Sequence, residues 1–226
     1  MVVAMDGPAG VGKSTVAARV ARETGFRYLN SGSFYRAISK AVLESGAQPE
    51  DPGRVLAVAR QCRFALCGGE LCLNGRPVGG LRTDQIDRWS TIHSVIPEVR
   101  SIVNENLRRI AAEGDFIVEG RDIGTVAFPG AELKIFLDAS LEARSTRRFL
   151  QGVSGLDKAE LARRIAERDE LDRSKPVGRL ERAPDAVYLD SSDLTIEEVC
   201  DRVTKEIRKR KSTGSQRNEL RTEEKP

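Results

Sequence analysis

Four residues near the start of the chain have the types and spacing of a phosphate-binding loop. Gly7, Gly12, Lys13 and Ser14 satisfy the pattern G-x-x-x-x-G-K-[ST]. Glycines let the backbone turn successive N–H groups inward around a polyphosphate, and the lysine places an ammonium on the outer phosphates. The serine hydroxyl is a ligand for the Mg²⁺ that accompanies them. The predicted nucleoside-triphosphate site, with Ser14 on the metal, consists of Gly7, Pro8, Ala9, Gly10, Val11, Gly12, Lys13, Ser14 and Thr15.

The elements around this loop support the assignment. An apolar run over residues 2–5 predicts a strand directly before the loop. Apolar residues at 16, 17, 20 and 21 predict an amphipathic helix directly after it, and the helix N-terminus adds attraction for anions. The alternative is a glycine turn that only caps an ordinary helix. The order strand, loop, helix favours a triphosphate site with Mg²⁺.

Two further groups of charged residues follow predicted strands, where ligands of open α/β sheets bind. Arg36 lies one turn into the helix after the strand at 26–29. Two interpretations are equally favoured: Arg36 binds a second anion, or it is a solvated arginine on the helix surface. Arg121 and Asp122 lie between two glycines after the strand at 116–119. A bidentate phosphate contact through Arg121 is favoured over a purely structural Arg–Asp pair.

A third charged region is rich in arginine. Seven arginines lie between residues 144 and 173, and a charged helix is predicted over 157–172. Such a run is most often an exposed helix with many salt bridges. Beside a triphosphate site, we favour a lid that closes arginines over the phosphates and excludes water.

The predicted fold is α/β. Strands near residues 2, 27, 117, 134 and 187, separated by helical segments, imply a five-stranded parallel sheet with helices on both faces. Residues 62–82 alternate and contain Gly-Gly and Asn-Gly turns, so they predict a β-hairpin insertion. Ser31 or Ser33 is expected to cap the helix that contains Arg36. Beyond residue 209 the composition becomes polar, and we expect a disordered tail.

Composition limits the functional classes. A net charge of +3 over 226 residues suits an anionic small substrate and does not call for nucleic acid. No apolar run is long enough to cross a membrane and no signal peptide is visible, so we expect a cytoplasmic location. Separately, we expect a monomer. The four cysteines and the single histidine, His93, match no zinc spacing. We expect the cysteines to be reduced, buried or half-buried residues.

Taken together, these segments resemble the bacterial cytidylate kinases. The matching blocks occur in the family's order up to about residue 208, and they read DGPAGVGKST, NSGSFYR, EGRDIGTVAFP, KIFLDAS, ERDELDR and YLDSSDLTIEEV. The glycine loop is common to many kinases, whereas the SGSFYR and GRDIGTVAFP blocks are much more specific. The resemblance implies a P-loop nucleoside-monophosphate-kinase fold and Mg²⁺-dependent phosphoryl transfer from ATP to CMP or dCMP in pyrimidine nucleotide metabolism.

The resemblance also implies domain limits and residue roles. It divides the chain into a core (1–36, 101–150 and 179–210), a monophosphate-binding region with the hairpin (37–100), a lid (151–178) and a disordered tail (211–226). It implies that Arg36, Arg121 and Arg168 hold phosphate, that Arg100 and Asp122 read the cytosine, and that Asp172 reaches the sugar. The implied CMP site is Ser31, Arg36, Thr91, Arg100, Arg121, Asp122, Arg168 and Asp172. The implied catalytic residues are Lys13, Arg121, Arg147, Arg148 and Arg168.

Two positions depart from the family pattern, and two other functions compete with this one. Thr91, with Ser90 beside it, stands where the family often has a base-reading serine. Lys175 stands where many members have a lid arginine, and a lysine lacks the bidentate fork.

One rival function is another small-molecule P-loop kinase, acting for example on UMP. The other is a nucleotide-dependent switch protein, which the arginine-rich lid and the second anion site disfavour.

Overall fold

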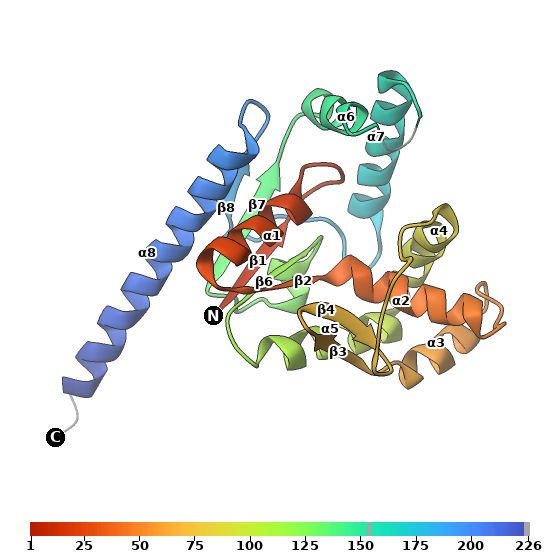
Figure 1. The fold of residues 1–226 in the computed structure, drawn as a ribbon, viewed down its shortest axis with the longest axis horizontal. Coiled ribbons are helices and arrows are strands. Elements are labelled where there is room, and N and C mark those ends of the chain that lie inside the picture. The colour runs from red at the N-terminus through yellow and green to blue at the C-terminus, as the bar shows by residue number, and fades with distance from the viewer. Residues whose placement is uncertain (153–154, 224–226) are drawn as a thin grey trace.

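The centre of the molecule is a five-stranded sheet in the order β2–β6–β1–β7–β8 (Figure 1). It is seen in a computed structural model that describes residues 1–152 and 155–223, with side chains as far as residue 213. The strands are β1 (Val2–Asp6), β2 (Arg27–Asn30), β6 (Phe116–Gly120), β7 (Leu133–Asp138) and β8 (Val187–Asp190). All neighbouring strands pair in parallel, which confirms the predicted α/β sheet.

Helices cover both faces of this sheet. α1 (Lys13–Thr24) and α8 (Ile196–Glu223) share one apolar core with Val3 and Met5 of β1. α2 (Ser31–Glu44) and α5 (Pro97–Ala111) share the other core with Ala4 of the same strand. Successive residues of a strand point to opposite faces, so an unbroken apolar run is what a strand between two helical layers requires.

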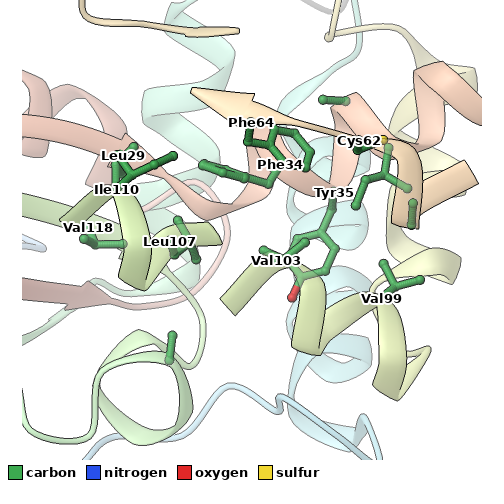
Figure 2. Packing of buried hydrophobic residues seen from close by; sticks show 14 of the residues in the cluster. Leu29, Phe34, Tyr35, Cys62, Phe64, Val99, Val103, Leu107, Ile110 and Val118 are labelled. Carbon is green, nitrogen blue, oxygen red and sulfur yellow. The ribbon is translucent and has the colours of Figure 1, made fainter. Parts of the chain in front are cut away.

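The predicted insertion is a small antiparallel sheet of β3 (Phe64–Cys67), β4 (Glu70–Leu73) and β5 (Arg76–Pro77). It packs on the core formed with α2 and α5, where the Phe34 and Phe64 rings lie 4.8 Å apart (Figure 2). α3 (Pro52–Gln61) precedes the small sheet and α4 (Asp84–His93) follows it. The hairpin prediction is therefore confirmed, with one more short strand than expected.

Three further elements surround the carboxyl edge of the large sheet. The π-helical turn η1 (Ile123–Ala127) follows β6, and α6 (Leu141–Leu150) follows β7. α7 (Lys158–Ser174) packs against α6, and the two lie together beyond the end of β7 (Figure 1). Within the described residues, no helix combines the length and apolarity needed to cross a membrane.

Two local predictions were wrong. Asn30, and not Ser31 or Ser33, caps α2, because its Oδ1 accepts the Ser33 N–H at 3.1 Å. Asn30 is the last residue of β2 and has the extended backbone that a cap requires.

The segment predicted to be a disordered tail from residue 211 continues α8 to Glu223, since lysine, arginine and glutamate are good helix formers. Residues 224–226 of that prediction lie outside the described residues.

The cysteine prediction was wrong for one pair. Cys67 and Cys72 form a disulfide across the β3–β4 turn, where their Cα atoms lie 6.0 Å apart. The antiparallel register brings the two residues together, and a spacing of five residues does not reveal that register. Cys62 and Cys200 are unpaired and buried, as expected.

Candidate active site

The phosphate-binding loop connects β1 to α1 as the sequence predicts. Lys13 is buried, and its Nζ donates to the carbonyl oxygens of Gly7 and Pro8, each at 2.8 Å. Burial, and then the charge of Arg121, lowers the pKa of Lys13 to about 7. The structure therefore brings a residue of the predicted acceptor site close enough to act electrostatically on the loop lysine.

A buried carboxylate lies near the predicted metal ligand. Ser14 is half-buried at the start of α1, and the Tyr28 hydroxyl lies close to it. Tyr28 donates in turn to the buried carboxylate of Glu119, to which Asn30 Nδ2 also donates, at 2.5 Å. Mg²⁺ prefers oxygen ligands and usually takes one or two from the protein. These residues fit that ion, although the described residues hold no cluster of three or more metal-binding side chains.

The predicted phosphate clamp Arg36 is held by an acidic residue that sequence reasoning missed. Arg36 Nε donates to Asp87 Oδ1 of α4 at 2.6 Å, and both side chains are partly exposed. Ser31, the other predicted residue at this edge, is buried at the start of α2. Because β2 and β6 are neighbours, both residues lie at the same edge of the sheet as Arg121.

The predicted acceptor residues converge on one carboxylate. Asp172, in the last turns of α7, is fully buried and accepts from Arg121 Nε at 2.8 Å. It also accepts from Lys175 Nζ at 2.8 Å and from Arg168 Nε at 3.3 Å. Burial alone would raise the pKa of Asp172, but the charges of Arg121, Arg168 and Lys175 outweigh it and hold that pKa far below its usual range. The charged helix thus turns one face into the site.

The two predicted base-reading residues form a second buried pair. An Arg100 nitrogen donates to Asp122 Oδ2, and the other terminal nitrogen donates to the Ser94 carbonyl at 3.0 Å. The loop after α7 closes over this pair at Gly178, where a Cβ would lie 2.1 Å from the Arg100 guanidinium carbon. Gly178, at a φ of 65°, is therefore required by this close approach.

The structure distinguishes the two candidate hydroxyls of α4. The Thr91 hydroxyl accepts from Arg168 and donates to the Asp87 carbonyl at 2.9 Å. Ser90 is buried, and its hydroxyl donates to the same carbonyl at 3.0 Å. Thr91 therefore contacts Arg168, another predicted site residue, whereas the hydrogen bond of the Ser90 side chain stays within α4.

Two predicted arginines are not brought into this group. Arg147 donates to Ser191 Oγ at 3.1 Å and to the Leu194 carbonyl at 3.2 Å, in the loop after β8. Arg148 is exposed on α6 and donates to Gln151 Oε1 at 3.2 Å. Their role in screening the transferred group remains a prediction.

A buried pair that sequence reasoning missed joins α7 to the phosphate-binding loop. Asp169 Oδ1 accepts the Ala9 N–H at 2.9 Å, and its Oδ2 accepts from Arg144 NH1. Arg144 NH1 also donates to the Ala9 carbonyl at 2.9 Å. One signal was visible in the sequence, since Asp169 follows Leu161 and Ile165 at helical spacing on the apolar face of α7. A carboxylate on an apolar face requires a partner.

Comparisons with known proteins identify the family of this chain. A family model described as cytidylate kinase matches residues 3–209. A cytidylate kinase from Caldanaerobacter subterraneus is 40% identical, covering 92% of this chain and 94% of its own. Relatives of the same name from Solibacter usitatus and Nocardia farcinica are each 39% identical over 95% of this chain, and the match covers 95% and 97% of their lengths. The chain belongs to the cytidylate kinase family.

Proposed function

We propose that this protein transfers the γ-phosphoryl group of ATP to CMP and dCMP, forming ADP and the nucleoside diphosphate. One observation carries the proposal. The phosphate-binding loop, with Lys13, lies beside a second group of cations around Asp172. Two anionic nucleotides can therefore meet end to end, with positive charge gathered where the phosphoryl group is exchanged.

In this proposal the loop from Gly7 to Thr15 binds ATP. Its backbone N–H groups and the N-terminus of α1 face the phosphates, and Lys13 exchanges its two carbonyl partners for phosphate oxygens. Ser14 would hold Mg²⁺, and the Glu119 carboxylate, which accepts from the Tyr28 hydroxyl, lies nearby. When bound, the metal neutralises charge on the phosphate oxygens.

The acceptor would be held at the other end of the site. Arg36, Arg121 and Arg168 bind its phosphate by replacing their carboxylate partners. Thr91, Arg100 and Asp122 read the cytosine edge, Asp172 contacts the sugar, and Ser31 lines the pocket. Residues 37–100 then form the acceptor-binding region and residues 151–178 the lid, of which 153–154 lie outside the described residues.

The chemistry demands little beyond position and charge. The attacking group is already an anionic phosphate, so no strong general base is needed. Catalysis comes from aligning donor and acceptor and from stabilising charge on the transferred group. Lys13, Arg121 and Arg168 provide this stabilisation in the arrangement seen here, with Arg147 and Arg148 as candidates that α6 would have to bring closer.

An acceptor panel tests the proposal. ADP release from ATP and Mg²⁺ would be measured with CMP, dCMP, UMP and AMP, each at the same concentration, and without acceptor as the control. We expect release with CMP and dCMP well above the other acceptors. Release with UMP alone would indicate a different small-molecule kinase. Hydrolysis that no acceptor stimulates would favour a nucleotide-dependent switch and refute the proposal.

A further inference from the structure

A buried carboxylate that is none of the proposed nucleotide contacts lies between the two halves of the site. Asp6 is the last residue of β1 and directly precedes the phosphate-binding loop. Its side chain is buried, and it accepts two successive backbone N–H groups. Ile123 N donates to Oδ1 at 2.8 Å and Gly124 N donates to Oδ2 at 2.7 Å.

These two amides belong to the loop that carries the acceptor residues. β1 and β6 pair in parallel up to Asp6 and Gly120, so the strand ladder ends at the residue before Arg121. Beyond that point the Asp6 carboxylate replaces the missing ladder partner and holds the chain just after Arg121 and Asp122. A carboxylate that accepts two N–H groups fixes both the position and the orientation of the loop, because each oxygen is committed to one amide.

The surroundings of Asp6 make its charged form unfavourable. Burial raises the pKa of Asp6 to about 6, while the Gly124 and Ile123 amides lower it. Asp122 faces it with a like charge and Lys13 with an opposite one. An apolar residue at this position would avoid that desolvation but would leave two buried N–H groups without acceptors.

We propose that Asp6 is a positioning residue for the acceptor: its carboxylate sets Arg121 and Asp122 at the correct place relative to the phosphate-binding loop. The inference rests on the proposed function, since it assigns Arg121 and Asp122 to CMP. Asp6 touches neither nucleotide in this account. It acts through the loop backbone, so its loss should weaken acceptor binding while the donor loop keeps its own contacts.

The first test is the Asp6→Asn variant, studied by steady-state kinetics with each substrate varied in turn. The amide keeps the size of the side chain, removes its charge and turns an NH₂ toward one of the two N–H groups. Hydrogen bonds to charged groups contribute enough that losing one changes an equilibrium about tenfold or more. We expect the KM for CMP to rise about tenfold and the KM for ATP to change less than about twofold. A purely structural role would move both KM values or lower kcat alone.

A second variant perturbs the same contact without changing a charge. A Cβ at Gly124 would lie 3.1 Å from Lys134 Cδ, closer than an ordinary contact, and 3.4 Å from Asp6 Oδ2, so Gly124→Ala crowds the side chains around this hydrogen bond. Gly124→Ala should also raise the KM for CMP, by a smaller factor. It replaces Asp6→Asn as the test variant if Asp6→Asn does not fold. The matched control is Asp138→Asn, because Asp138 ends the neighbouring strand β7 and bonds to Ala139 N and Tyr188 instead.

The outcomes separate the two proposals. If the unaltered protein releases no ADP with CMP, the proposed function fails before any variant is compared. If the unaltered protein is active but folded Asp6→Asn and Gly124→Ala keep its KM for CMP, the positioning role of Asp6 is refuted and the proposed function stands. Equal increases in the KM values for CMP and ATP would also refute it.

Discussion

Replacing Asp172 with asparagine should destabilise the protein more than any exchange of an exposed carboxylate. The side chain is fully buried and accepts from Arg121, Arg168 and Lys175. Asparagine has nearly the same volume, so no cavity contributes to the effect. What changes is the charge, because three cations lose the single anion that they share.

The magnitude follows from the burial of that anion. Removing one partner of a buried ion pair costs about 3–5 kcal/mol, because the remaining charge is left uncompensated. In a chain of this size each kcal/mol lowers the melting temperature Tm by about 2–4 °C. We therefore expect the Tm of Asp172→Asn to fall by about 6–20 °C. The control Glu160→Gln removes a partly exposed carboxylate that pairs with Arg163 and Arg164, and its Tm should change by less than about 4 °C.

The assay is thermal unfolding at several pH values, with and without inorganic phosphate. The pKa of Asp172 is lowered on folding, so its stabilising contribution is present above the unfolded-state pKa near 4 and is lost as the pH falls below it. The difference in Tm between the two proteins should therefore shrink in acid. Phosphate should raise the Tm of the variant more than that of the unaltered protein, because it supplies the missing negative charge. A fall in Tm below about 3 °C, unaffected by phosphate, would refute the reasoning, since the three cations would then be solvated independently.

Three further predictions concern single residues. Lys13→Ala should lower kcat by at least about 10²–10³-fold, with no change of fold by circular dichroism. An unchanged rate would refute the proposed mechanism of phosphoryl transfer. Arg121→Ala should raise the KM for CMP at least about tenfold more than the KM for ATP, as steady-state kinetics can measure. His93 is buried between Ser39 Oγ at 2.8 Å and the Pro49 carbonyl at 3.0 Å, and burial lowers its pKa below 6.5. Because His93 is the single histidine, its imidazole resonances in NMR should report that lowered pKa without overlap, and stability should fall as the pH drops through 6.5; resonances titrating above 6.5 would contradict this.

Several details could not be read from the sequence because they depend on register or on competing local contacts. The Cys67–Cys72 disulfide follows from the antiparallel pairing of β3 with β4. The cap of α2 went to Asn30 because the strand ends at that residue and its side chain reaches the first free N–H groups. The continuation of α8 past residue 209 shows that a polar, charged segment can extend a helix that packing has already nucleated.

The sequence alone determined the local chemistry of the site and the class of fold. The loop from Gly7 to Ser14 is a contiguous motif whose backbone and side chains act within one turn of chain, so the order of residues is sufficient. The apolar runs of β1, β6 and β7 predicted the parallel sheet because strands buried on both faces are apolar throughout, whereas the edge strands β2 and β8 are only half-buried.

Only the tertiary structure decided which charges meet. Arg121 and Asp172 are 51 residues apart, Arg100 and Asp122 are 22 apart, and Asp6 is 117 residues from Ile123. An isolated arginine or aspartate in a sequence is compatible with solvent or with many partners. Its partner is chosen by the strand order and by the helix faces packed at the carboxyl edge of the sheet, which bring these charged residues together.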